Sequence, residues 1–328
     1  MQATLAATSR LDACETLCGR DLRSIRDLTR QELLGLIGLA ADVKQQPGRY
    51  AAALAGRTLA MVFEKPSLRT RLSFDVASHQ LGAHAIYLAP QEIGLGHRET
   101  IEDVARTLDR MVDAVMLRTF AHDRVEQLAA AASIPVINGL SDFSHPCQAL
   151  ADYLTMREVK GGLAGLHLAF VGDGNNVANS LIFGAALLGV RVAVSTPPGY
   201  EPPAAVLAWA RKHATLHGAT CRLASCPEDA VRDADVVYTD TWIGMGQDAE
   251  AEERRRAFAG FTVTQDLLDR ASPDVVFMHC LPAHRGEEVA ADVIDSTRSI
   301  VFRQAENRLH TEKALLLALL GQDSPRGH

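Results

Sequence analysis

The sequence has no long apolar run, no C-x-x-C pair of cysteines and no excess of positive charge. No stretch could span a bilayer, and residues 1–10 lack a basic start followed by an apolar run, so we expect a cytoplasmic protein. The six cysteines include no C-x-x-C pair and no histidine at zinc-finger spacing, which favours unpaired, reduced thiols over a metal site. The net charge of −7 argues against nucleic acid or an anionic membrane as the main partner.

The composition is that of an ordinary globular protein large enough for two cores. The chain has 328 residues, of which 47% are hydrophobic and 22% are charged. This length exceeds one typical core and predicts two domains. We place them at residues 1–150 and 151–309, with a final helix at about 310–322 that packs back on the first domain.

Strand and helix patterns alternate along the first half of the chain. Thr29 and Glu32 form a capping box ahead of an apolar helical pattern, which predicts a helix start. Strands are expected over 58–63, 84–88, 114–117 and 134–137. Helices are expected to begin near residues 67, 100, 125 and 146. Such alternation with short loops predicts a parallel sheet covered by helices.

The second half repeats this alternation. Strands are expected over 167–171, 191–195, 236–238 and 275–278, and helices over 177–188, 204–213, 264–270 and 312–320. The charged run 250–256 is expected to be a solvated face. The predicted fold class is therefore α/β, with two doubly wound domains of parallel sheets linked by interdomain helices.

A candidate anion site lies where the strand 58–63 meets the next helix. Ser67-Leu68-Arg69-Thr70-Arg71 combines hydroxyl donors and guanidinium groups with a helix start, whose backbone N–H groups and dipole attract anions. The alternative is a basic helix start on the surface. Arginine there opposes the helix dipole unless an anion is bound, which favours the functional interpretation.

The turn after the strand 167–171 is similar to a dinucleotide fingerprint but departs from it. Gly172-Asp173-Gly174-Asn175-Asn176-Val177 has Val177 in place of the third glycine, and two asparagines occupy the turn. A nicotinamide-dependent oxidoreductase is therefore the disfavoured alternative.

Several strings together resemble the aspartate and ornithine carbamoyltransferase family. Phe63-Glu64-Lys65-Pro66-Ser67-Leu68-Arg69-Thr70-Arg71 is similar to the family's carbamoyl-phosphate loop, in which threonine usually stands at the position of Leu68. Further family elements follow in order: Arg118 after a strand, His145-Pro146-Cys147-Gln148, the paired asparagines, Asp240, His279-Cys280-Leu281-Pro282, and Arg308 within 304–310. The resemblance extends from about residue 27 to about residue 320.

The resemblance implies transfer of a carbamoyl group from carbamoyl phosphate to the δ-amine of L-ornithine, giving citrulline and phosphate without metal or cofactor. Donors aimed at the developing oxyanion are each worth roughly 10²–10³ in rate. The residues implied to bind carbamoyl phosphate are Ser67, Leu68, Arg69, Thr70, Arg118, His145, Gln148 and Arg308. Those implied to bind ornithine are Asn176, Asp240, Gly244, Met245, Cys280 and Leu281. The catalytic residues implied are Arg118, His145, Asp240, Cys280 and Arg308.

Two further positions depart from the family pattern. Gly244 replaces the serine of a Ser-Met-Gly loop that closes over the amino acid, and Gly94 stands where relatives often have glutamine. These departures leave open a carbamoyltransferase for N-acylornithine or putrescine, or a catalytically weak metabolite-binding paralogue. The resemblance also implies a homotrimer or a multiple of trimers, with carbamoyl phosphate bound by the first domain and ornithine by the second. The sequence does not distinguish arginine synthesis from arginine breakdown.

Overall fold

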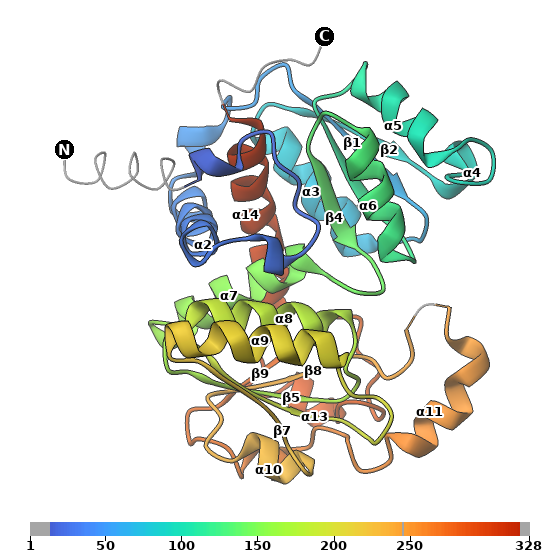
Figure 1. Cartoon of the computed structure of the whole chain (residues 1–328). Helices are drawn as coiled ribbons and strands as arrows, with labels where there is room; N and C mark the ends of the chain where they lie inside the picture. Colours follow the sequence, from blue (N-terminus) through green and yellow to red (C-terminus); the bar gives the residue numbers. More distant parts are fainter. Residues whose placement is uncertain (1–13, 245, 322–328) are drawn as a thin grey trace, which may run out of the picture. The chain divides into compact units, whose positions relative to one another are not determined.

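A computed structural model describes residues 14–244 and 246–321, which divide into two compact units (Figure 1). Of the described residues, unit 1 comprises 14–154 with 306–321, and unit 2 comprises 155–244 with 246–305. The boundary falls inside two helices, α7 (Pro146–Lys160) and α14 (Val301–Leu320). Each unit contains one parallel sheet flanked by helices, which confirms the predicted α/β fold class.

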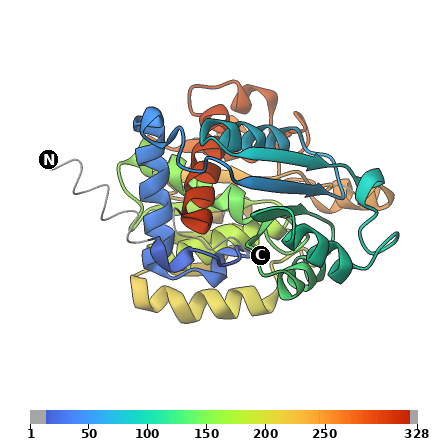
Figure 2. The same ribbon diagram turned by 90° about the horizontal axis from the view of Figure 1, so that it is seen from above.

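The sheet of unit 1 has the strand order β2-β1-β3-β4. Its strands are β1 (Thr58–Phe63), β2 (His84–Leu88), β3 (Ala114–Arg118) and β4 (Val136–Leu140). Alternate residues of the central strands, such as Val62 and Leu117, pack against apolar side chains of α5 (Ile101–Asp109) and α6 (His122–Ala131). Figure 2 shows these two helices on the side of the strands opposite α3 (Leu68–Gln80).

The remaining helices of unit 1 are short or N-terminal. The capping box predicted at Thr29 is present, with the Glu32 N–H donating to Thr29 Oγ1 and the Thr29 N–H donating to the Glu32 carboxylate. These elements are η1 (Glu15–Leu17), η2 (Ile25–Asp27), α2 (Arg30–Gln45), η3 (Pro47–Tyr50) and α4 (Pro90–Ile93).

The sheet of unit 2 has the strand order β7-β6-β5-β8-β9. Its strands are β5 (His167–Val171), β6 (Arg191–Ser195), β7 (Thr220–Leu223), β8 (Val236–Thr239) and β9 (Val276–His279). Helices α8 (Asn176–Leu188) and α9 (Ala204–His217) lie together over one face of this sheet, and α10 (Pro227–Val231) lies on the other (Figure 1). The shorter elements are η4 (Asp248–Glu250), α11 (Ala251–Ala257), α12 (Gln265–Leu268) and α13 (Ala291–Ile294).

Four strands have the predicted bounds, β3, β8 and β9 differ from them by one residue at one or both ends, and β4 and β7 depart further. β1, β2, β5 and β6 begin and end where predicted. β4 begins two residues later than expected, at Val136 rather than residue 134. β7 was not predicted, because its polar, largely exposed sequence Thr-Cys-Arg-Leu forms an edge strand with no apolar signature.

The final helix is the largest correction. It was expected to begin near residues 310–312, but α14 begins at Val301, so Arg308 lies inside the helix rather than before it. The polar run before residue 310 suggested a loop. Its side chains are instead buried with partners: Gln304 donates to Tyr238 Oη at 3.0 Å, and Asn307 accepts from Lys44 Nζ at 2.7 Å. Buried polar groups with partners are compatible with a helix.

The charged run 250–256 is not simply a solvated face. Arg254 of α11 is only 4% exposed. Its guanidinium pairs with Asp173 in the turn after β5 and also donates to the Trp242 carbonyl. It packs over the Tyr200 ring as well, 4.9 Å from the ring centre. Arg254 therefore joins α11 to the β5 turn and to the loop that contains Gly244.

Two further expectations concern the chain as a whole. All six cysteines lie in the described residues and are thiols, which confirms the prediction of no disulfides among them. Within residues 14–244 and 246–321, we find no helix with both the length and the apolarity needed to cross a bilayer.

Candidate active site

The sheet topology of unit 1 places its candidate residues at one edge. The chain passes from β1 to β2 on one side of β1 and then crosses to β3 on the other side, so the carboxyl ends of β1 and β3 flank a topological switch point. Ligands in open α/β sheets bind at such points. Residues 64–67 follow β1, and Arg118 ends β3 in register with Phe63.

The anion loop forms the start of α3. Ser67 is the N-cap residue, and its Oγ accepts a hydrogen bond from the Thr70 N–H at 3.3 Å. The Leu68 side chain is 75% exposed, so this position contributes its backbone to the loop rather than its side chain. Thr70 is buried, and Arg69 is half-buried. The helix start predicted from the sequence is therefore present, with one of its N–H groups already capped.

Two buried arginines from distant segments meet the Thr70 hydroxyl. Arg118 Nη1 and Arg308 Nη2 each lie 3.4 Å from Thr70 Oγ1. Arg308 Nη1 also donates to Gln148 Oε1 at 2.9 Å, while its Nη2 pairs with Glu312 Oε1 at 2.6 Å. Four predicted donor-site residues thus come together in unit 1. Glu312, which holds Arg308, was missed because a lone glutamate in an apolar helix carries no motif.

His145 lies buried beside this group of cations. Burial, followed by the positive charges of Arg308 and Arg118, lowers the pKa of His145 well below its ordinary value. Lys65 and Arg69 contribute in the same direction. The imidazole is therefore neutral at physiological pH, and it can donate or accept a hydrogen bond without adding charge.

Lys65 is a further cation at the same edge that was not among the predicted site residues. Its side chain is largely buried, with Nζ 4.6 Å from the centre of the Phe120 ring. Burial and then the charge of Arg118 lower the pKa of Lys65 to about 8. The Phe-Glu-Lys-Pro string contained this residue, but only the folded structure reveals its desolvation.

The lowered pKa of Lys65 predicts that an anion will bind unit 1 with a pH-dependent affinity. As pH rises through about 8, Lys65 loses the charge that attracts an anion, so we expect phosphate to bind about tenfold more weakly at pH ~9.5 than at pH ~7.5. Calorimetric titration with inorganic phosphate measures this difference. Lys65→Met should bind weakly at both pH values, and an equally steep pH dependence in that variant would contradict the assignment.

The loop around Gly94 explains one departure from the family pattern. Gly94 ends α4 with a φ of 52°, in the left-handed region that favours glycine. A Cβ at this position would lie 2.9 Å from Arg98 Cβ. Arg124 anchors the loop by donating to the Leu95 carbonyl at 3.2 Å and by pairing with Glu64. The loop is therefore built around a glycine at residue 94 and tied to the end of β1.

The switch point of unit 2 lies between β5 and β8, where the predicted amine-binding groups meet. Asp240 follows β8, and its Oδ1 accepts hydrogen bonds from Cys280 Sγ at 2.8 Å and from the Thr241 N–H at 2.8 Å. Asn175 donates to Asp240 Oδ2 at 2.7 Å while its own Oδ1 caps the start of α8. Asn176, the predicted residue, is the first of α8. The contact to Asp240 comes from its neighbour Asn175, which the sequence interpretation did not select.

The turn after β9 orients Cys280 and Leu281. His279 is fully buried, and its Nδ1 accepts the Leu281 N–H at 2.8 Å. Its Nε2 must then carry the proton, which points to Glu288 Oε1 at 3.2 Å. Leu281 has a φ of 58°, and the peptide bond to Pro282 is cis. Histidine and glutamate together fix the backbone that presents the Cys280 thiol and the Leu281 carbonyl.

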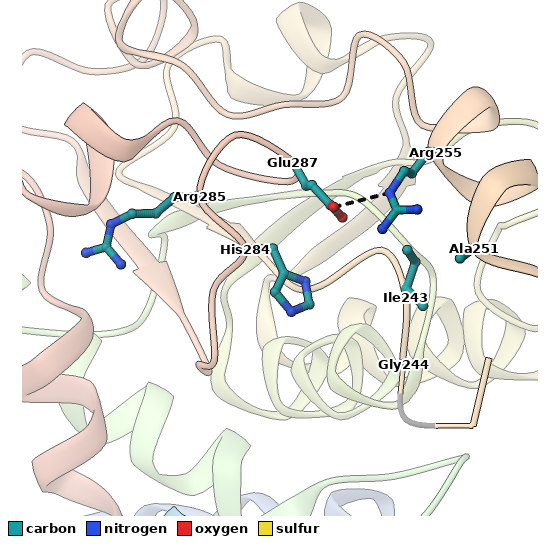
Figure 3. A pocket seen from close by; sticks show the side chains of 7 residues that line it. All are labelled: Ile243, Gly244, Ala251, Arg255, His284, Arg285 and Glu287. Atoms are coloured by element: carbon teal, nitrogen blue, oxygen red, sulfur yellow. Dashed lines mark hydrogen bonds and ion pairs between the residues drawn. The ribbon is translucent and has the colours of Figure 1, made fainter. Parts of the chain in front are cut away.

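Gly244 lies apart from these contacts, in the wall of a pocket of about 570 Å³ within unit 2 (Figure 3). The pocket is lined by Ile243, Gly244, Ala251, Arg255, His284, Arg285 and Glu287. The Gly244 N–H donates to Gln247 Oε1 at 2.7 Å. Met245, also predicted to bind ornithine, lies outside the described residues.

Two family models match the chain. Residues 20–158 match the family model described as the aspartate/ornithine carbamoyltransferase carbamoyl-P binding domain. Residues 164–319 match the model described as the Asp/Orn binding domain of the same proteins. The two matches together span nearly the whole chain.

Individual relatives are similar over almost their full lengths. The ornithine carbamoyltransferase of Thermococcus kodakarensis is 54% identical over 308 residues, covering 93% of this chain and 98% of that protein. The Bacillus subtilis enzyme of the same name is 48% identical over 305 residues, covering 93% and 95%. The solved structure of ornithine carbamoyltransferase from Pyrococcus furiosus has a TM-score of 0.90 at 54% identity, covering 93% of this chain and 98% of that one. On this similarity and the grouping of its predicted residues, the chain belongs to the aspartate/ornithine carbamoyltransferase family.

Proposed function

We propose that the chain transfers the carbamoyl group of carbamoyl phosphate to the δ-amine of L-ornithine, giving citrulline and phosphate. The observation that carries this proposal is the convergence of Arg118 and Arg308 on the Thr70 hydroxyl beside a neutral, buried His145. Relatives with about half of their residues identical are named ornithine carbamoyltransferases, which supports the choice of acceptor.

The residues of unit 1 suit a phosphorylated carbonyl donor. Arg69, Arg118 and the Ser67–Leu68 helix start would hold the phosphate, because guanidinium groups and helix-start amides match phosphate oxygens. Thr70, His145 and Arg308 would polarise the carbonyl oxygen, and Gln148 would bind the carbamoyl amide. As the neutral amine attacks the carbon, the C–O bond to phosphate breaks, phosphate leaves with the electron pair, and one proton of the nitrogen passes to the phosphate. Positioning and charge stabilisation suffice, so no covalent protein nucleophile is required.

The residues of unit 2 suit an amine acceptor. The Asp240 carboxylate, the Cys280 thiol and the Leu281 carbonyl would orient the attacking nitrogen. Asn176 would bind the α-carboxylate, and the loop at Gly244 and Met245 would close over the amino acid. A second carboxylate on the acceptor would be repelled by Asp240, which disfavours aspartate.

Citrulline formation from carbamoyl phosphate and ornithine by the purified protein tests this proposal directly. Parallel assays with N-acetylornithine, N-succinylornithine and putrescine show which amine is the preferred acceptor. We expect the highest kcat/KM with ornithine. Faster turnover of another amine would change the proposed acceptor, and no turnover of any amine would support a metabolite-binding paralogue instead.

Gly244→Ser measures what the missing loop hydroxyl contributes. The backbone at Gly244 is not in the left-handed region, and an added Cβ would lie 2.9 Å from Gln247 Oε1, the end of a flexible side chain. We therefore expect a stability within about 0.5 kcal/mol of the parent and a several-fold lower KM for ornithine at similar kcat.

Gly244→Ala is the matched control, because it adds the same Cβ without the hydroxyl. Equal KM values for the serine and alanine variants would show that the hydroxyl makes no substrate contact.

We further propose that carbamoyl phosphate binds unit 1 and ornithine binds unit 2, in a cytoplasmic homotrimer or a multiple of trimers. Unit 1 exposes the apolar side chains of Leu68 and Leu72 on α3, 75% and 58% exposed, and of Ile86 on the edge strand β2. An apolar patch beside a strand edge favours a subunit contact. Light scattering after size-exclusion chromatography measures the oligomer, and a monomeric mass at micromolar concentration would refute it.

A further inference from the structure

A second group of possible ligand atoms in unit 2 does not include Asp240 or Cys280. His284, Glu287 and Glu288 bring one nitrogen and two carboxylate oxygens within 4.8 Å of one another. His284 and Glu287 line the pocket beside Gly244 (Figure 3). We propose that these three side chains form a binding site for a divalent transition-metal ion of the zinc type, open to the pocket.

The buried carboxylate of Glu288 is the main observation behind the proposed metal site. Its side chain is fully buried, and its Oε1 accepts the His284 N–H at 2.6 Å and the proton on His279 Nε2 at 3.2 Å. Its Oε2 is buried and has no hydrogen-bond partner among the described residues. The nearest candidate is His284 Nδ1 at 3.8 Å, too far for a hydrogen bond. An unsatisfied buried carboxylate oxygen is costly, and a cation held between Oε2 and the imidazole would remove that cost.

Glu287 adds a second carboxylate, and the neighbouring arginines do not hydrogen-bond to both of its oxygens. Its Oε1 accepts from Arg255 Nε at 3.2 Å, but its Oε2 is buried without a hydrogen-bond partner in the described part of the chain. Arg255 also pairs with Glu252. Arg285 pairs with Asp295 at 2.9 Å and points away from His284 and Glu287 in Figure 3. Each of the two carboxylates therefore has one oxygen, Oε2, that no hydrogen bond within the described residues occupies and that a dication could use.

The chemistry of the three donors selects the type of ion. Imidazole with carboxylates suits Zn²⁺ and neighbouring first-row metals, whereas Mg²⁺ and Ca²⁺ prefer all-oxygen sites. Three protein donors leave a coordination position for water or a ligand from the pocket. His279 would not bind the ion itself. It would orient the Glu288 carboxylate through its hydrogen bond to Oε1.

A competing set of ligands lies nearby and must be separated by experiment. Asp240, His279 and Cys280 also lie within 4.8 Å of one another. In that set, however, both ring nitrogens of His279 are already engaged, by the Leu281 N–H and by Glu288. A metal there would have to break one of these buried hydrogen bonds, whereas the His284 set requires no such loss.

Equilibrium dialysis of the untagged, metal-free full chain against Zn²⁺ tests the proposal. We expect His284→Gln and Glu287→Gln to weaken zinc binding by about tenfold or more. Both side chains are partly exposed, so the variants should fold, which circular dichroism checks. His217→Gln, on α9 outside both sets, is the matched control and should bind as the parent does. Unchanged binding in both the His284 and Glu287 variants would overturn the site.

Cys280→Ser and cobalt spectroscopy identify which set holds the ion. Cys280→Ser should bind zinc as tightly as the parent does, in contrast to His284→Gln. Co²⁺ at the His284 site should give ligand-field bands without a thiolate charge-transfer band, because no sulfur coordinates the ion. Loss of all zinc in Cys280→Ser, or a thiolate band that disappears with it, would assign the metal to the other set instead.

Discussion

Arg308→Ala is expected to abolish carbamoyl-phosphate binding and to destabilise unit 1 by about 3–5 kcal/mol. Arg308 is 2% exposed and pairs with Glu312, whose side chain is 1% exposed. Without the guanidinium, Glu312 would remain as an uncompensated buried carboxylate, and Gln148 and Thr70 would each lose a hydrogen-bond partner. Chemical denaturation and isothermal titration with carbamoyl phosphate measure the two effects.

The stability loss should depend on pH with a definite sign. Burial raises the pKa of Glu312 to about 7, although Arg308 opposes the shift. Removing Arg308 raises that pKa further, so the folded state then binds more protons than the unfolded state over a wider range. Stability therefore falls as pH rises through this range, and the variant should lose more at pH ~8 than at pH ~5.

A double variant separates folding from binding. Arg308→Met with Glu312→Leu removes both charges together, and replacing a buried ion pair by apolar side chains is often close to neutral. We expect this variant to recover most of the stability while carbamoyl phosphate still fails to bind. Recovery of binding as well would mean that Arg308 acts only through the fold.

Arg69→Ala should lower kcat/KM for carbamoyl phosphate by about 10²–10³-fold while leaving the fold intact. Arg69 lies in the first turn of α3, and its charge is one of those that act on buried His145. In the proposed mechanism its guanidinium holds the phosphate as it departs. Steady-state kinetics measures the loss, and an unchanged melting temperature shows that the fold survives.

Arg71→Ala is the matched control two residues along the same helix. Its guanidinium lies over the Tyr87 ring, 3.9 Å from the ring centre, and the residue is exposed. Losing it should cost only the stacking contact, about 0.5–1 kcal/mol, with kcat/KM within a few-fold of the parent. If Arg69→Ala were as active as Arg71→Ala, the loop would have a structural role only.

Local sequence patterns predicted the elements that depend on local chemistry. The capping box at Thr29 and the apolar runs of β1 and β5 are short-range signals, and each element formed where it was expected. β7 and the first half of α14 carry no such signal, because an edge strand and a helix with buried polar side chains are stabilised by partners distant in sequence.

The residues of the candidate site likewise divide into those that sequence motifs identified and those that only the folded structure revealed. Motif strings identified Thr70, Arg118, Gln148 and Arg308, and the folded chain brings these four together. The strings did not identify Glu312 behind Arg308 or Asn175 beside Asp240. Neither did they predict that Lys65 is desolvated. Each of these depends on a neighbour that only folding supplies.

The sequence alone therefore determined the α/β class, the order of its motifs and the kind of chemistry they favour, because residue type and near-neighbour spacing encode those properties. Only the tertiary structure decided which charges are buried, which carboxylate oxygens lack a hydrogen-bond donor and which groups are hydrogen-bonded to each other. Those properties depend on desolvation and on contacts between segments far apart in the chain, such as Thr70 with Arg308 and His279 with Glu288.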